Sequence, residues 1–318
     1  MNPLKIALTC SLGLPLLAAG GSCEPCPATL VSQEQLVAEY NANAAMVPRL
    51  WARAKVQVKF VDAKGRAFTW GSTLLPPNAL LHLRKGAGRL GPHDFLLHGR
   101  EAGQEVFRAG VSTADGVYYF WTHYGGEGGG LYGRNALAGA AGVEQMPIDP
   151  HQLLSVLGIT ELPADFTQPP TVLMRMDDRP QHCAYVLTYI DRQPITGKIV
   201  SRREAYFDWH DKRPRRPFQI NFFDEHGRSV MIATMKAYKP ITAEDVDNPP
   251  AAPAEMPTDI KITWPQKGSE IHIVLSEMTT ADLVDPELFK FWDRLPGAVR
   301  SNLTCVDSHL KVAEGATK

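Results

Sequence analysis

The pattern of hydrophobic and polar positions is most informative between Glu105 and Tyr132. Two runs of strand-forming residues flank Asp115-Gly116, a dipeptide that favours a hairpin because glycine tolerates the positive φ of a tight turn. The second run, residues 117–124, is aromatic on both of its alternating faces. Neither face is therefore expected to lie in water. The pattern predicts a sheet that is covered on both sides or curled around something apolar.

Shorter alternating runs continue on both sides of this hairpin, and local turns join them. Regularly spaced strands with local turns indicate an antiparallel sheet. We expect further strands at residues 56–62, 67–74, 79–85, 94–98, 171–177, 183–191, 198–209, 218–223, 229–238, 260–264 and 270–277. The glycine-rich stretch 125–133 is predicted to be a flexible loop, and it lacks the Gly-Lys-Ser/Thr of a phosphate-binding loop.

Helix signals occur in three places. Residues 32–35 have the pattern of a capping box, and an apolar stripe with helical spacing follows to about Ala54, with a kink expected at Pro48. Asp149-Pro150 and Asp285-Pro286 each supply an N-cap and a first helical residue for a short helix. The sequence thus predicts few helices among many strands.

The N-terminus has the pattern of a secretory signal peptide over residues 1–22, with an apolar run too short to span a membrane and small residues before Cys23. This site resembles the lipobox of bacterial lipoproteins, in which the cysteine becomes the acylated N-terminus. Gly20 departs from that motif, which prefers leucine there. The alternative is ordinary cleavage near Gly20, which would give a soluble secreted protein. Residues 23–31 would form a tether.

Four cysteines remain beyond the leader. Export leads to an oxidising compartment, so Cys183 and Cys305 are candidates for a disulfide. Cys23 and Cys26 have the spacing of a redox motif, but they lie in a tether without a βαβ context, so thioredoxin-like activity is not expected. Acylation of Cys23 would leave Cys26 without an assigned role.

The formal net charge is -1 at pH 7, which argues against a general nucleic-acid binder. The densest basic run is a proline-interrupted stretch that contains Lys212, Arg213, Arg215 and Arg216. A solvated loop is the simpler interpretation. The alternative is contact with anionic lipid head groups, to which each basic residue near the membrane contributes about 1 kcal/mol.

Enzyme motifs are largely missing, since there is no Gly-x-Ser-x-Gly elbow and no His-Glu-x-x-His. His93, Asp94 and His98 cluster on one predicted strand, but strand geometry points the two histidines to opposite faces, so no metal site is expected. We therefore expect neither an enzyme nor a cofactor. Paired carboxylates for glycoside cleavage stay open, because such pairs are assembled in space.

The order of elements resembles the LolA/LolB-like superfamily of bacterial envelope lipoprotein carriers. The resemblance covers about residues 32–292, and four segments carry it: Ser112–Trp121, Ile148–Leu157, Met256–Ile260 and Leu288-Phe289. It implies a mostly antiparallel β fold with few helices, in which a curled incomplete β-barrel, or half-barrel, has helices on its concave side. It also implies one domain at 32–292, a C-terminal tail at 293–318, and an apolar cavity that binds acyl chains.

The aromatic strand is consistent with a cavity. If its aromatic face lines the concave side of a strongly curled sheet, helices or a ligand must fill that side. The cavity-lining candidates are Val117, Tyr119, Trp121, Trp70 and Phe68. Of the two faces of the aromatic strand, the one with Trp121 is predicted to point inward, because Trp121 is the bulkiest apolar group. The apolar helices at 36–51 and 153–157 would form a lid. The alternative is that these aromatic residues are ordinary core.

The resulting hypothesis is a non-enzymatic cell-envelope lipoprotein that binds an acyl chain, a lipid or a lipoprotein in an apolar cavity. Lipid on Cys23 would anchor it at the periplasmic face of a membrane, the outer membrane first, and its partner would be a lipid or an acylated protein. One alternative is an envelope structural or sensing module that binds a partner protein. A secreted hydrolase is disfavoured because the motifs are missing.

Overall fold

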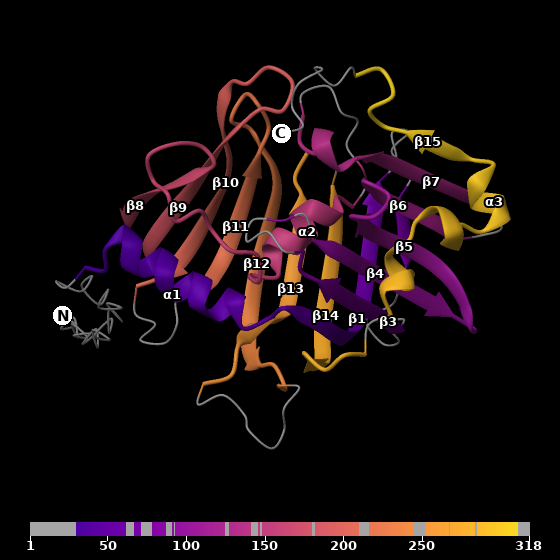
Figure 1. Cartoon of the computed structure of the whole chain (residues 1–318), viewed down its shortest axis with the longest axis horizontal. Helices are drawn as coiled ribbons and strands as arrows, with labels where there is room; N and C mark the ends of the chain where they lie inside the picture. The colour runs from indigo at the N-terminus through magenta and orange to yellow at the C-terminus, as the bar shows by residue number, and fades with distance from the viewer. Residues whose placement is uncertain are drawn as a thin grey trace, which may run out of the picture.

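One sheet dominates the protein. The computed structural model describes residues 30–61, 67–70, 78–86, 91, 93–124, 127–140, 146, 148–179, 182–209, 216–243, 252–266, 268–283 and 285–310. Within these residues fifteen strands form a single sheet (Figure 1). The strands are β1 (Arg49–Val61), β2 (Ala67–Trp70), β3 (Asn78–Arg84), β4 (Asp94–Glu101), β5 (Gln104–Ser112), β6 (Val117–Tyr124), β7 (Glu127–Arg134), β8 (Thr171–Arg179), β9 (His182–Arg192), β10 (Ile199–Asp208), β11 (Pro217–Phe223), β12 (Ser229–Pro240), β13 (Glu255–Trp264), β14 (Ser269–Thr279) and β15 (Leu303–Cys305).

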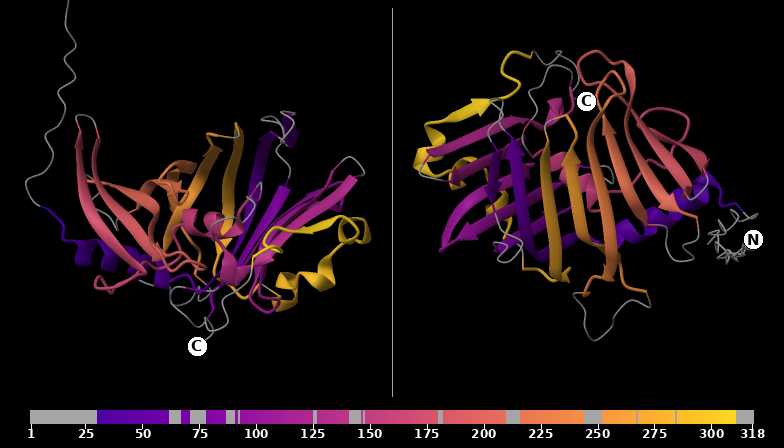
Figure 2. Two further views of the ribbon diagram at one scale, coloured as in Figure 1. Left: turned by 90° about the horizontal axis from the view of Figure 1, so that it is seen from above. Right: turned by 180° about the vertical axis from the view of Figure 1, so that it is seen from behind.

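Two meanders meet at the centre of this sheet, where β1 pairs with β14. One runs from β1 through β3, β4, β5 and β6 to β7, and the other runs from β14 back to β8. β15 joins β7 in parallel, whereas the meander pairs are antiparallel. The sheet stays open, with β15 and β8 as its end strands, and Figure 2 shows that it is strongly twisted. The predicted mostly antiparallel β fold is confirmed.

Helices are few in the described part of the chain. They are α1 (Gln33–Ala45), α2 (Pro150–Val156), α3 (Gly297–Arg300) and the 3-10 helices η1 (Asn135–Leu137), η2 (Pro286–Phe289) and η3 (Trp292–Arg294). The predicted N-caps form, since Ser32 Oγ accepts the Gln35 N–H and the Asp149 carboxylate accepts the His151 N–H. None of the described helices has the length and apolar character needed to cross a membrane.

The first helix is shorter than its apolar stripe predicts. α1 ends at Ala45, and the chain enters β1 at Arg49 instead of continuing as a helix to Ala54. Pro48 explains this, because it lacks a backbone N–H and disfavours the helical conformation of the residue before it. The apolar residues beyond it, such as Leu50, reach the core from a strand.

The main core lies on the face of the sheet that carries α1 and α2, here called the helix face (Figure 1). α1 contributes Leu36 and Tyr40 to it. Residues 285–306 are here called the C-terminal segment, and its helical part packs against the opposite face of β4–β7, here called the outer face. This half of the sheet is therefore covered on both sides, which is one of the two arrangements that the aromatic alternation predicts.

Part of the C-terminal segment was expected to be a tail beyond the domain. Instead, α3 packs on β6 and β7, and β15 adds a strand to the sheet edge. Val299 and Leu295 are buried against the aromatic strand. The sequence signal was weak here because this segment is short and irregular, and only its contacts with β6 and β7 define its place.

The glycine-rich stretch is not the flexible loop that the sequence predicts, because residues 127–134 form β7. Aromatic residues of β6 stand directly opposite three of its glycines, in the pairs Tyr118–Gly133, Trp121–Gly130 and His123–Gly128. A Cβ atom at Gly130 would lie 3.0 Å from the Trp121 Cβ, and one at Gly133 would lie 2.7 Å from the Tyr118 ring. These glycines therefore make room for large neighbours, which is a recurrent reason for glycine inside a strand.

Candidate ligand-binding site

A groove of about 870 Å³ lies at the β7 edge of the sheet. Phe120 and Leu131 form its apolar floor, and both pack with the main core on the helix face. Polar groups surround the floor, from Thr122, Ser301, Asn302 and Thr304. The groove is thus an opening at the end of the apolar interior.

Gly129 explains why this space is empty. It pairs with Thr122 and lies in the groove lining beside the cross-strand pair of Phe120 and Leu131. A Cβ atom at Gly129 would meet nothing closer than the Asn302 carbonyl oxygen at 3.9 Å. Gly129 therefore differs from Gly130, whose missing side chain is required by packing. At Gly129 the missing side chain leaves the groove open to a ligand.

The far wall of the groove belongs to the C-terminal segment. The Asn302 side chain donates a hydrogen bond of 2.9 Å to the Gly128 carbonyl oxygen, and the Gly130 N–H donates to the Asn302 carbonyl oxygen at 3.2 Å. Val299 is buried beneath this wall. The wall is thus fixed to the backbone of β7 on one side and to the outer-face core on the other.

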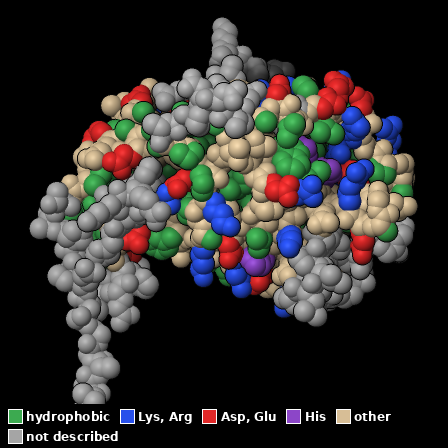
Figure 3. Space-filling model, turned by 90° about the horizontal axis from the view of Figure 1, so that it is seen from below, with side chains coloured by type: hydrophobic (Ala, Val, Ile, Leu, Met, Phe, Trp, Pro, Cys, Tyr) green, Lys and Arg blue, Asp and Glu red, His purple; other side chains and the backbone are tan. Residues whose placement is uncertain are grey.

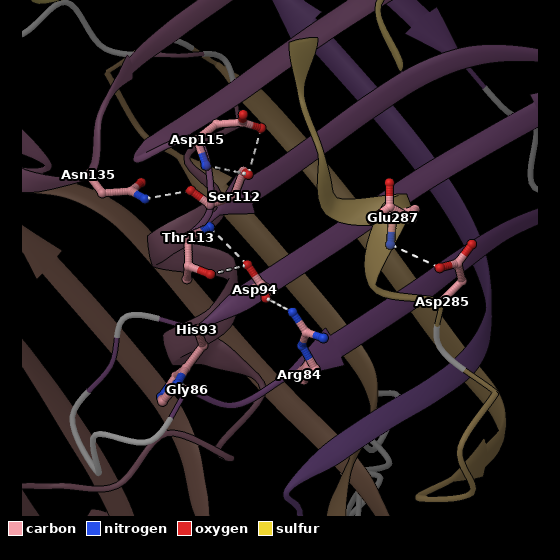
Figure 4. Close-up of polar contacts among 10 residues, drawn as sticks. All are labelled: Arg84, Gly86, His93, Asp94, Ser112, Thr113, Asp115, Asn135, Asp285 and Glu287. Atoms are coloured by element: carbon pink, nitrogen blue, oxygen red, sulfur yellow. Dashed lines mark hydrogen bonds and ion pairs between the residues drawn. The ribbon is translucent and has the colours of Figure 1, made fainter. Parts of the chain in front are cut away.

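Asp94 organises the turn that precedes the aromatic strand (Figure 4). Its buried carboxylate accepts hydrogen bonds from the Thr113 N–H at 2.8 Å and the Thr113 hydroxyl at 2.6 Å, and it pairs with Arg84 at 2.9 Å. All these contacts tie β3 and β4 to the β5–β6 turn. The Asp94 carboxylate therefore has a structural role.

The same turn also holds the C-terminal segment. Asp115 Oδ2 accepts hydrogen bonds from the Ser112 hydroxyl at 2.8 Å and from the Phe291 N–H at 2.7 Å. The Asn135 side chain donates to the Ser112 carbonyl oxygen at 3.0 Å (Figure 4). The turn at residues 112–116 thus clamps the C-terminal segment, which carries the groove wall, to the sheet, a role that the sequence did not suggest.

A second polar cluster lies buried between the outer face and the C-terminal segment. His82 is 3% exposed, its ring centroid lies 5.4 Å from that of His98, and neither of its ring nitrogens has a hydrogen-bond partner among the described residues. His98 approaches Glu105 at 3.3 Å, and Glu105 also pairs with Arg108 at 2.7 Å. Burial, followed by the charges of His98 and Arg108, lowers the pKa of His82 to about 4. The His82 ring is therefore neutral at pH 7.

The three cavity candidates of the aromatic strand point to the other side. Val117, Tyr119 and Trp121 pack in one cluster with Phe291 of the C-terminal segment, and the Tyr119 and Phe291 rings stack at 4.4 Å. It is Tyr118 and Phe120 that join the main core on the helix face. The prediction of the inward face is therefore corrected. Side-chain bulk could not decide it, because both faces are aromatic and both are covered.

The remaining candidates from the sequence fall largely outside the described residues. This holds for Cys23, Lys212, Arg213 and Arg215, and for the side chains of Phe68 and Trp70. Arg216 is described, and it is not a free head-group contact: it pairs with Glu255, and its guanidinium carbon lies 5.2 Å from the centre of the Tyr238 ring. On the face seen in Figure 3, acidic and basic side chains are interspersed with hydrophobic ones.

The expected disulfide between Cys183 and Cys305 is wrong. Cys183 is disulfide-bonded, whereas Cys305 carries a free thiol whose sulfur lies 3.2 Å from Asp307 Oδ1. The two residues lie in different parts of the sheet, on β9 and on β15 at the opposite edge. A shared oxidising compartment makes pairing possible, but the fold decides which thiols meet.

The histidines at 93 and 98 each have their own surroundings. His93 Nδ1 accepts the Gly86 N–H at 3.3 Å (Figure 4), whereas His98 faces Glu105. Across the described ranges, no group of three or more His, Cys, Asp or Glu side chains is arranged to hold a metal ion.

Comparison with known proteins shows the fold. No family model and no curated protein matches the chain. A DUF1329 family protein from Desulfovibrio piger is similar with a TM-score of 0.50 and 12% identity, over 82% of this chain and 99% of that one. A LolA superfamily protein from Nitrosomonas europaea follows, with a TM-score of 0.46 and 10% identity over 84% of this chain and 100% of that one. A putative outer membrane lipoprotein-sorting protein domain from Vibrio parahaemolyticus gives a TM-score of 0.46 and 11% identity, over 81% and 95%.

The structural neighbours thus include DUF1329 and LolA superfamily proteins, and the sequence resemblance predicted the second of these. At these identities the likeness is one of fold. The groove and its glycine were missed by reasoning from the sequence, although one signal was present: a glycine run directly beside an aromatic strand indicates close cross-strand packing.

Proposed function

We propose that this protein is a non-enzymatic cell-envelope protein that binds the acyl chain of a lipid or lipoprotein in the groove at the β7 edge. One observation carries the proposal: the groove has an apolar floor of Phe120 and Leu131 that continues into the main core, with hydroxyl and amide groups at its rim. Its volume of about 870 Å³ lies within the range of small-molecule sites, roughly 300–1,000 Å³.

The class of ligand comes from the sequence resemblance to the LolA/LolB-like superfamily, whose members bind acyl chains. The apolar floor fits a hydrocarbon chain, because burying each CH₂ group is worth roughly 0.8 kcal/mol. The polar rim suits the ester or amide to which such a chain is attached. The strong twist of the sheet supports a half-barrel shape around the helix face (Figure 2).

The leader and the lipobox-like site at Cys23 support anchoring by an N-terminal lipid at the periplasmic face of a membrane, with the outer membrane as our first choice. A single acyl chain binds a membrane only marginally, so stable anchoring requires the several chains of a bacterial lipoprotein. The partner in this proposal is a lipid or an acylated protein.

The test fills the groove. A leucine at Gly129 would occupy the groove without a backbone clash, because the nearest atom to its Cβ is 3.9 Å away. We expect Gly129→Leu to weaken binding of a fluorescent fatty acid at least tenfold, measured by fluorescence titration of protein cleared of lipid. Native mass spectrometry of the purified wild type is expected to show bound lipid that the variant lacks.

Gly297→Leu is the matched control. It adds the same side chain at an exposed position of α3 that lies outside the groove, and a Cβ there meets no atom within 4 Å. This variant is expected to bind like the wild type. If the wild type binds no acyl ligand, or if a folded Gly129→Leu protein binds as well as the wild type, the proposal is wrong and a partner-protein module becomes the better hypothesis.

A further inference from the structure

Arg203 is a cation placed among apolar groups on the helix face. It lies on β10 on the same face as Ala205 and Phe207, both of which belong to the main core. Its neighbours across the sheet are Tyr189 on β9 and Phe222 on β11. An arginine in this position has apolar or aromatic residues on each side.

Among the described residues, the polar and ring contacts of Arg203 are with neutral groups. Its guanidinium donates a hydrogen bond to the Ser155 hydroxyl of α2, and its central carbon lies 4.6 Å from the centre of the Tyr189 ring. Tyr40 of α1 faces the same place: burial raises the pKa of Tyr40, and the nearby charge of Arg203 partly offsets this. Arg203 therefore sits where α1, α2 and the sheet meet.

No carboxylate pairs with Arg203 among the described residues, and this sets it apart from the most buried arginines. The Arg108 side chain is 4% exposed and pairs with Glu105, and the Arg216 side chain is 8% exposed and pairs with Glu255. Taking a charge out of water is costly unless it is paired. A guanidinium has five N–H donors in a fork that matches a carboxylate or a phosphate. Arg203 thus has guanidinium N–H donors that can bind an anion.

α2 connects this place with the groove. Its His151 ring packs edge-on against Tyr118, two residues from the groove floor at Phe120, with ring centroids 5.3 Å apart. Ser155, the partner of Arg203, follows one helical turn later, a rise of about 6 Å. Both places border the main core on the helix face.

We propose that Arg203 binds the anionic head, a carboxylate or a phosphate, of an amphiphile whose acyl chain lies along the helix face toward the groove. This inference rests on the proposed acyl binding and narrows its ligand to an anionic class. The anion replaces the Ser155 hydroxyl as the partner of the guanidinium, because a charged acceptor forms the stronger hydrogen bonds. Tyr189 keeps the guanidinium plane oriented by its cation–π contact.

The binding test compares three probes on the mature protein cleared of lipid: palmitate, lysophosphatidic acid and the neutral hexadecanol. The wild type is expected to bind the two anionic probes at least tenfold more tightly than hexadecanol. Arg203→Met removes this preference and leaves hexadecanol binding unchanged, and Arg203→Lys keeps part of it. Arg175→Met is the control, because Arg175 pairs with Glu204 on β10, which alternates with Arg203 and so points to the other face.

Thermal unfolding supplies a second readout that a merely structural role would not give. Replacing an unpaired, half-buried charge by an apolar side chain of similar size removes its desolvation cost. Arg203→Met is therefore expected to raise the unfolding temperature of the ligand-free protein, and to abolish the further rise that palmitate causes in the wild type.

Three results would overturn the inference. Equal binding of palmitate and hexadecanol by the wild type would show that the site does not select an anionic head group, while the proposed binding of acyl chains would still hold. Binding of inorganic phosphate alone as tightly as lysophosphatidic acid would indicate a site for a free anion. Loss of stability in Arg203→Met with an unchanged preference for anionic probes would make Arg203 a structural residue. Failure of every acyl probe would instead overturn the proposed function itself.

Discussion

The buried histidine at position 82 makes stability depend on pH. Its pKa in the folded protein, about 4, lies below the ordinary value of 6.5, so folding favours the neutral ring. The stability that depends on this neutral ring is complete above about pH 6.5 and is lost as the pH falls toward 4. Between pH 7.5 and pH 5 we expect this group alone to lower the free energy of unfolding by about 2 kcal/mol.

His82→Gln isolates this effect, because glutamine stays neutral at all pH values. The loss of unfolding free energy between pH 7.5 and pH 5, measured by chemical denaturation, is expected to be about 2 kcal/mol smaller in the variant than in the wild type. His93 and His151 also have lowered pKa values and contribute to both proteins equally. Glu105 also has a lowered pKa, so its protonation affects stability only below about pH 4.5, which is outside this range.

His226→Gln serves as the control for His82→Gln, because His226 lies in an exposed turn, with its side chain 67% exposed. Equal pH dependence in the His82→Gln variant and the wild type would show that the His82 ring is not held neutral. If the prediction holds, hydrogen exchange should also locate the acid-induced opening in the C-terminal segment, which covers the His82–His98 pair.

At the scale of elements, α1 is tied to the rest of the fold by side-chain amides. Gln33 pairs with the backbone of β8, where its amide binds the Val172 carbonyl oxygen and the Met174 N–H. Asn43 pairs in the same way with the backbone of Glu255. β8 is an end strand of the sheet, so Gln33 satisfies backbone groups that an open edge leaves unpaired. The helix is thus anchored at both ends.

Asn41, two residues before Asn43, makes the buried contact of this kind. Its side chain donates to the Leu162 carbonyl oxygen at 2.9 Å and accepts the Leu162 N–H at 2.7 Å. Asn41→Ala would leave both backbone groups buried without a partner. We expect it to lower the free energy of unfolding by about 2–4 kcal/mol, measured by chemical denaturation.

Gln35→Ala is the matched control for Asn41→Ala on the same helix. The Gln35 side chain is exposed, and its one bond to a described residue is with Glu39, so its removal is expected to change stability by less than about 0.5 kcal/mol. An Asn41→Ala protein as stable as this control would mean that water replaces the lost partner and that α1 is loosely held. Such a helix would be a mobile lid rather than a fixed cover.

At the scale of the whole molecule, the cysteine count predicts a covalent connection between β9 and the N-terminal region. The sequence has five cysteines, and Cys183 is bonded while Cys305 is free. Among the described residues no cysteine is left to pair with Cys183, and Cys10, Cys23 and Cys26 lie outside them. If the leader is removed and Cys23 is acylated, Cys26 remains.

We therefore predict that peptide mapping under non-reducing conditions joins Cys183 to Cys26. Such a bridge would close a loop of over a hundred residues, for which the chain-entropy model gives on the order of 5 kcal/mol as an upper value. The bridge would fix the N-terminal tether to β9, near one edge of the sheet. Recovery of Cys183 as a free thiol, or joined to Cys305, would contradict this prediction.

Local patterns in the sequence determined much of this protein. Alternation placed most strands, the residues Ser32 and Asp149 placed the starts of two helices, and aromatic residues on both faces of β6 predicted a sheet covered on both sides. These features depend on residues that are neighbours along the chain, and backbone geometry sets their periods. For this reason the fold class was accessible without coordinates.

The tertiary structure decided what each face of the sheet meets. Alternation separates Tyr118 from Trp121 but cannot tell which faces the helices, because that depends on a clamp between Asp115 and Phe291, 176 positions apart. Gly129 lines an open groove, and Gly130 does not tolerate a side chain, only because of what packs above each. Contacts between distant residues carry no local period, so the groove, the Arg203 environment and the free thiol of Cys305 became visible only in three dimensions.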